Sequence, residues 1–180
     1  MFGLFKKKTT TAESFNEELA EFAKEIITLS AALAGRYLET RKDKFTNNNN
    51  KDIFNTTNEF IFFFFHCLSR ECYLLKGKKA QIEIYEPIAR LSYNILTIDS
   101  TDADREEYAE IFTDSQLKAE KLYANCHAIK NDEGSLIGTV VFEASKRIAI
   151  TDEKEDILLA SDMVFLGLKA LKINERIKNL

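Results

Sequence analysis

Four polar side chains in one stretch of the chain have the types and the spacing to bind an anion. The stripe Glu59, Phe63, His66, Arg70 and Tyr73 has intervals of four, three, four and three residues, which places it on one face of a helix. The Arg70 guanidinium can hold an anion or a carboxylate with two parallel hydrogen bonds, and Glu59 or His66 can tune that contact. We therefore take Glu59, His66, Arg70 and Tyr73 as a candidate ligand- or partner-binding stripe. Helices with one solvent-facing stripe are common, so the alternative interpretation is an ordinary wet face.

The cysteines and histidines are spaced in a way that argues against a metal site. They fall into two clusters, His66, Cys67 and Cys72, then Cys126 and His127. Two ligands on one helix bind a metal from the same face, three or four residues apart, and no pair in the first cluster has that spacing. Buried cysteines in a reducing compartment are the simpler interpretation. We therefore expect no metal and no cofactor.

The chain contains no catalytic motif. It lacks HExxH and GxSxG sequences, the glycine patterns of dinucleotide and Walker sites, and the DFG-like set of kinases. Acidic residues alternate from Asp102 to Glu106 as in a calcium loop, but the glycine is missing and Thr113 stands where the closing glutamate belongs. The absence of motifs favours a non-catalytic protein over an enzyme.

The candidate stripe lies on "NEFIFFFFHCLSRECYLL", residues 58–75, which carries five phenylalanines within six positions. Its apolar run, residues 60–68, is too short for a membrane span, which takes about 20 residues. Residues 56–59 have the pattern of a capping box that starts a helix, and Leu74 and Leu75 extend the apolar pattern beyond a usual strand. On a helix the phenylalanines point in nearly every direction, so this segment predicts a buried, central helix.

Composition indicates a single all-α domain. The chain has 180 residues with one proline and six glycines, too few turn residues for an all-β or doubly wound fold. We expect one domain, residues 12–180, built as a bundle of about six or seven helices with long first and last helices. The net charge of −4 and the dispersed lysines and arginines argue against a nucleic-acid partner.

The two ends of this domain carry apolar heptad patterns. In the first helix the intervals alternate between four and three at Phe15, Leu19, Phe22, Ile26, Leu29 and Leu33. In the last helix they alternate in the same way at Leu159, Met163, Leu166, Ala170, Ile173, Ile177 and Leu180. Such seams predict helices that pack along their length. We expect both helices to pack in the bundle, or one of them to pair with a second subunit.

Local signals predict the breaks between helices. Residues 46–51 are expected to form an Asn-rich loop. Gly77 ends the phenylalanine-rich helix, and Pro87 kinks the next helix or opens its main part. Residues 128–150 fit either a hairpin or a helix, and we favour the helix because an isolated hairpin is marginal in water.

The start of the chain is expected to be a flexible tail, residues 1–11. Its sequence "MFGLFKKK" leaves open a weak peripheral membrane contact through residues 1–8, with apolar side chains inserted and lysines on anionic head groups. A signal peptide has the opposite order, positive first and apolar second. We expect a cytoplasmic protein without a transmembrane segment.

Two hypotheses of function follow. The first is a non-catalytic helical protein that binds a protein partner or associates with itself, and the absence of motifs favours it. The second is a small-molecule-binding protein or enzyme with a pocket beside the Phe-rich helix, because aromatic walls with a few convergent polar groups are typical of ligand pockets. An enclosed cavity with Arg70 and His66 pointing in would support the second hypothesis, whereas a tightly filled core would support the first.

Overall fold

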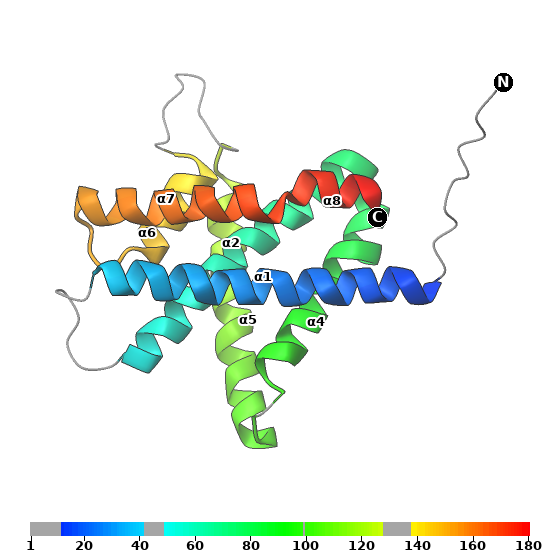
Figure 1. Cartoon of the computed structure of the whole chain (residues 1–180), viewed down its shortest axis with the longest axis horizontal. Coiled ribbons are helices and arrows are strands. Elements are labelled where there is room, and N and C mark those ends of the chain that lie inside the picture. Colours follow the sequence, from blue (N-terminus) through cyan, green and yellow to red (C-terminus); the bar gives the residue numbers. More distant parts are fainter. Residues whose placement is uncertain (1–11, 42–48, 99, 128–137) are drawn as a thin grey trace.

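The regular elements of the protein are helices. The computed structural model describes residues 12–41, 49–98, 100–127 and 138–180. In chain order the elements are α1 (Ala12–Thr40), α2 (Asn49–Lys76), α3 (Lys78–Ala80), the π-helix η2 (Gln81–Tyr85), α4 (Glu86–Leu96), α5 (Asp102–Ala124), α6 (Val140–Ile148), α7 (Lys154–Leu171) and α8 (Ile173–Asn179) (Figure 1). Six of these described helices have nine or more residues. The predicted all-α bundle of about six or seven helices is therefore confirmed.

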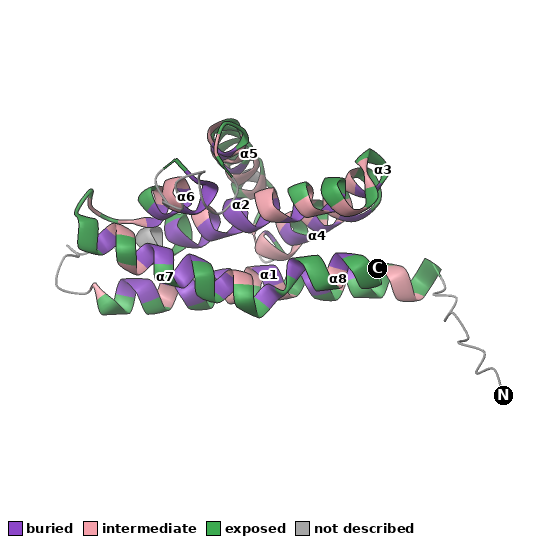
Figure 2. Ribbon diagram, turned by 90° about the horizontal axis from the view of Figure 1, so that it is seen from above, coloured by how far each residue is buried: buried purple, intermediate pink, exposed green. Residues whose placement is uncertain are grey.

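The helices form two main layers. The first consists of α1 with α7 and α8, and α1 runs antiparallel to α7 beside it (Figure 1). The second layer is centred on α2, which lies against the first and contacts α1, α5, α6 and α8 (Figure 2). Because α2 has neighbours on most sides, it can bury apolar residues around its whole circumference.

The phenylalanine run of α2 is the centre of the core. Every residue from Phe60 to Phe65 is at most 2% exposed. The ring of Phe62 meets that of Phe112 on α5 edge-on, with centroids 4.9 Å apart. On the other side Gly167 lets α7 approach closely, because a Cβ atom at this position would lie 2.3 Å from Cζ of Phe64. The predicted central Phe-rich helix is confirmed.

The start of α2 differs from the prediction. The helix begins at Asn49, so residues 49–51 of the predicted Asn-rich loop are helical, and residues 46–48 lie outside the described residues. The capping box at residues 56–59 is wrong, because Thr56 lies inside the helix. Thr56, Thr57 and Asn58 are buried, so tertiary packing holds this part of the chain in the helix and overrides the local signal.

The last helix is interrupted at Lys172. This residue has φ 47° and ψ 43°, a left-handed conformation that separates α7 from α8. Met163, Ile173 and Ile177 of the predicted seam are buried, but Leu166 and Ala170 are exposed. The core-facing positions of α7 are instead Ala160, Val164, Gly167 and Leu171. Helix α7 is thus rotated relative to the predicted seam, because Gly167 contacts the Phe64 ring and Leu166 points outward.

A buried polar cluster joins the end of α1 to the start of α7. Arg41 Nε lies 2.5 Å from Oδ1 of the fully buried Asp156. The backbone N–H and the hydroxyl of Thr151 donate to Asp156 Oδ2 at 3.1 and 2.7 Å. The backbone N–H of Ile150 donates to the Tyr37 hydroxyl at 2.9 Å, and burial raises the pKa of Tyr37 to about 12. Hydrogen bonds and opposite charge thus compensate the burial of these polar groups.

Other local signals act as predicted. Gly77 has φ 78° immediately after α2, and Pro87 stands in the first turn of α4, where a missing N–H costs little. Residues 140–148 are helical, as favoured, whereas residues 128–137 and the predicted tail of residues 1–11 lie outside the described residues. Of the helices described, none has both the length and the apolar character needed to cross a bilayer.

Candidate functional site

The four predicted stripe residues do not share one groove. Phe63, in the middle of the stripe, is completely buried, and Tyr73 at its end is 56% exposed. Glu59 lines one pocket, whereas His66 and Arg70 line another. The helical spacing correctly placed these residues on one face of α2, but different neighbours pack on that face along its length.

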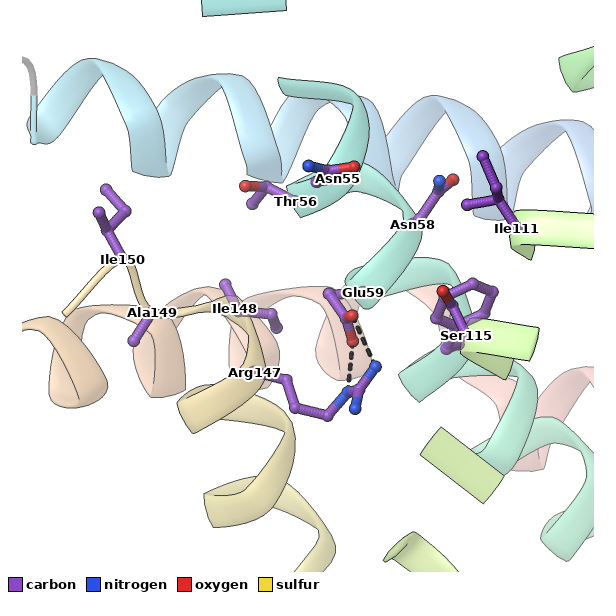
Figure 3. A pocket seen from close by; sticks show the side chains of 11 residues that line it. Asn55, Thr56, Asn58, Glu59, Ile111, Ser115, Arg147, Ile148, Ala149 and Ile150 are labelled. Carbon is purple, nitrogen blue, oxygen red and sulfur yellow. Dashed lines mark hydrogen bonds and ion pairs between the residues drawn. The ribbon is translucent and has the colours of Figure 1, made fainter. Parts of the chain in front are cut away.

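The first pocket, the Glu59 pocket, has a volume of about 380 Å³ and lies between α2, α5, α6 and the chain that follows α6 (Figure 3). It is lined by Asn55, Thr56, Asn58, Glu59, Phe62, Ile111, Ser115, Arg147, Ile148, Ala149 and Ile150. Glu59 and Arg147 form a forked ion pair, in which Nε and Nη2 of the guanidinium donate to the two carboxylate oxygens at 2.6 Å each (Figure 3). The two main charges of this pocket therefore satisfy each other.

The Glu59 carboxylate is paired with Arg147 and lines a different pocket from Arg70. Burial raises the pKa of Glu59, and the hydrogen bonds and charge of Arg147 oppose that rise. The residues are 88 positions apart in the chain, so no local pattern could have paired them. The only sequence signal for this pair was the position of Glu59 next to a buried apolar run, because a buried carboxylate needs a partner.

The second pocket, the Arg70 pocket, has a volume of about 500 Å³ and lies between α2, the start of α6, and the junction of α7 with α8. Its apolar walls are Phe63, Val140, Val141, Leu168 and Ile173, and its polar lining is His66, Cys67, Arg70, Glu71, Lys169, Lys172, Asn174 and Glu175. Small-molecule sites usually combine apolar walls with placed polar groups, and this pocket joins five apolar side chains to eight polar ones.

The charged groups of the Arg70 pocket leave a positive excess. Glu71 accepts a hydrogen bond from Asn174 at 2.7 Å, and Lys172 lies 3.7 Å from Glu175. In the part of the chain that the structure describes, Arg70 and Lys169 make no ion pair or hydrogen bond. Three cations face two carboxylates in a protein whose net charge is −4. The pocket is therefore suited to an anion.

His66 and Cys67 are both held in their neutral forms. Burial and, secondly, the charge of Arg70 lower the pKa of His66, while Glu120 opposes this shift. The Nε2 atom of His66 is buried without a hydrogen-bond partner among the described residues, and its ring meets Tyr123 edge-on at 5.3 Å. Burial raises the pKa of the Cys67 thiol to about 12, so this cysteine is not a thiolate nucleophile.

The lowered pKa of His66 predicts a pH-dependent stability. The unfolded chain, with a value near 6.5, binds a proton at His66 more readily than the folded protein does. The protein is therefore destabilised as the pH falls from the pKa of His66 in the unfolded chain toward its lower pKa in the folded protein. His66→Gln should reduce the loss in the free energy of unfolding between about pH 7.5 and pH 5.5, measured by urea denaturation. His127→Gln, at an exposed histidine, is the control, and parallel pH profiles of parent and His66→Gln would contradict the prediction.

The structure thus brings together two of the four predicted residues, His66 and Arg70, and adds others that sequence reasoning missed. Lys169 and Lys172 were visible as basic residues near the end of the last helix, where they suit the helix dipole. Their position beside Arg70 depends on the packing of the α7–α8 junction against α2.

Neither metal-ligand geometry nor similarity to known proteins assigns an activity. Across residues 12–41, 49–98, 100–127 and 138–180, no three His, Cys, Asp or Glu residues are grouped as a metal site would require. Comparison with protein-family models, curated proteins and solved structures gives no match for this chain. Function must therefore be argued from the pocket itself.

Proposed function

We propose that the protein binds a small amphipathic anion, a molecule with a carboxylate head and an apolar body, in the Arg70 pocket. The observation that carries this proposal is an arginine without an ionic partner at an apolar cavity that also includes His66. This is the second of the two hypotheses drawn from the sequence. It is supported by a pocket that both residues line, and this pocket is open to solvent at Arg70 rather than enclosed.

The pocket supplies the two kinds of contact that such a ligand needs. Its volume lies within the range of roughly 300–1,000 Å³ that small-molecule sites occupy. Leu168 and Ile173 offer apolar surface to the body of the ligand, and burying that surface is favourable by about 25 cal/mol per Å². The forked guanidinium of Arg70 fits a carboxylate with two parallel hydrogen bonds, and Lys169 adds a second positive charge.

The same residues support binding rather than covalent catalysis. Cys67 is protonated at neutral pH because burial raises its pKa to about 12. Glu71 is held by Asn174. A nucleophile activated by a neighbouring base, which covalent catalysis requires, is therefore not formed by these pocket residues.

Binding can be measured with dodecanoate as the probe, by titration calorimetry on the full chain, and with dodecanol as the uncharged comparison. We expect dodecanoate to bind more tightly than dodecanol, and Arg70→Gln to weaken dodecanoate binding by about tenfold, because a charge-assisted hydrogen-bonded contact is lost. Arg70→Lys should give a smaller loss, since it keeps the charge but not the fork. Arg70 is exposed and unpaired in the described chain, so both variants should melt like the parent.

The matched control is Arg90→Gln, which removes an exposed arginine of α4 that lies outside the Arg70 pocket. An equal loss of affinity in this variant would show that only the overall charge of the protein matters. Equal binding of dodecanol and dodecanoate, or no binding of either, would overturn the proposal.

A further inference from the structure

One face of α7 points away from the core and is apolar at its centre. We call it the outward face of α7, formed by Leu158, Asp162, Phe165, Leu166 and Lys169. Leu158, Phe165 and Leu166 are 50%, 37% and 41% exposed. The positions from Leu158 to Lys169 recur at intervals of four, three and four residues, the spacing of a helix seam that packs against another helix.

The chain's own core uses the opposite side of this helix. The buried residues Ala160, Gly167 and Leu171 lie about half a turn away from Leu158 and Phe165. Two exposed leucines and a phenylalanine on one helix face need a reason, because aromatic and aliphatic groups gathered on a surface commonly mark an interaction site.

The charges of the outward face have opposite signs at its two ends. Asp162 lies toward the start of α7 and Lys169 toward its end, two helical turns apart. Within the described ranges neither side chain makes an ion pair. The two residues lie equally far, in sequence, from the point between Phe165 and Leu166. The charged pair is therefore complementary to itself when the face is turned around that point.

We propose that the outward face of α7 binds the same face of a second copy of this chain, antiparallel about a two-fold axis. A two-fold interface pairs residue i of one copy with residue j of the other, and j with i. With the axis between Phe165 and Leu166, Asp162 of each copy lies opposite Lys169 of the other. Phe165 and Leu166 of both copies meet at the axis, where the aromatic contact removes apolar surface from water. A parallel arrangement would instead place Asp162 against Asp162, which is unfavourable.

The layer that contains α7 offers further area for this interface. A stable interface buries about 1,200–2,000 Å² in total, more than a single pair of short helices supplies. Helix α1 lies beside α7 in the same layer (Figures 1 and 2). Three of its exposed residues, Thr28, Ala31 and Ala32, are small, so a second copy can approach this part of the layer closely.

Charge reversal tests the proposed pairing. We expect the wild type to form dimers at micromolar concentration in sedimentation velocity, and Asp162→Lys or Lys169→Asp alone to weaken the dimer on the order of 100-fold, because each reversal acts at two symmetric contacts. The double variant Asp162→Lys/Lys169→Asp should dimerise again. An equimolar mixture of the two single variants should form a heterodimer, since both of its contacts then join opposite charges.

The control is Glu110→Lys, which makes the same change of charge at an exposed position of α5 and should leave the dimer intact. Far-ultraviolet circular dichroism checks that each variant is folded. Lys169 also lies in the Arg70 pocket, so all measurements are made without ligand. A monomeric wild type, single variants that remain dimeric, or a double variant that stays monomeric would each overturn the proposal.

Discussion

Phe64→Ala should lower the free energy of unfolding by about 3–5 kcal/mol, the usual cost of removing a buried aromatic ring. The Phe64 side chain is completely buried and its ring touches the position of Gly167 on α7. On one side the space left behind is bounded by the backbone at Gly167, which cannot collapse into it, so a cavity term should add to the lost burial. Urea denaturation of parent and variant measures the difference.

A second substitution makes this prediction specific to the contact between Phe64 and Gly167. In the parent, Gly167→Ala should destabilise, because the added Cβ atom would lie 2.3 Å from Phe64 Cζ and 2.9 Å from Leu33 Cδ1. In the Phe64→Ala background the same change should stabilise by about 1 kcal/mol. The ring is gone, the end of the Leu33 side chain can move into the space that it leaves, and alanine is the better helix former. Leu74→Ala, at a position of α2 that is 64% exposed, should stay within about 0.5 kcal/mol of the parent. Additive effects of the two core substitutions would contradict the packing described for α2 and α7.

Asp156→Asn should lower the free energy of unfolding by about 3 kcal/mol. It removes the closest ionic partner of the mostly buried Arg41 and leaves Glu153, an exposed residue whose Oε2 lies 3.8 Å from Nη2 of Arg41. Asp156 is completely buried and the Arg41 side chain is 14% exposed. Asparagine keeps the size of aspartate and an oxygen that can accept from Thr151, so the expected loss is at the lower end for a broken buried pair. The midpoint and slope of urea denaturation give the measured value.

Two comparisons isolate the ion pair in this cluster. Asp152→Asn makes the same chemical change at an exposed position of the chain that leads into α7 and should stay within about 0.5 kcal/mol of the parent. Adding Arg41→Met to Asp156→Asn should recover part of the lost stability, because the mostly buried charge that has lost its closest partner is then removed. An Asp156→Asn variant that unfolds like the parent would show that Arg41 gains nothing from the buried carboxylate.

The helical class of this protein and the identity of its central helix could be read from the sequence. One proline and six glycines leave few places for turns, and five phenylalanines within six positions cannot all avoid water unless neighbours surround the helix. Gly77 and Pro87 act locally, through a left-handed conformation and a missing N–H. These features depend on each residue's own conformational limits or on total burial, and both can be judged without knowing the partner elements.

Helix ends and helix rotation depended on tertiary contacts. Thr56 has the local signal of a helix start, yet packing keeps it inside α2. The heptad pattern predicted Leu166 as a seam residue of α7, but the close fit of Gly167 against Phe64 turns Leu166 outward. Local signals of this kind are worth about 1 kcal/mol, which the burial of one large side chain exceeds.

The sequence determined only part of the candidate site, because the rest depends, like the helix ends, on tertiary contacts. Periodicity showed that Glu59, His66 and Arg70 share a face of α2, because helix geometry depends on the chain's own spacing. It could not show that Arg147, 88 residues away, pairs with Glu59, or that the α7–α8 junction brings Lys169 to the pocket of Arg70. The periodicity of a helix determines which of its side chains share a face. The elements that pack against that face determine which of those side chains are paired, buried or accessible to a ligand.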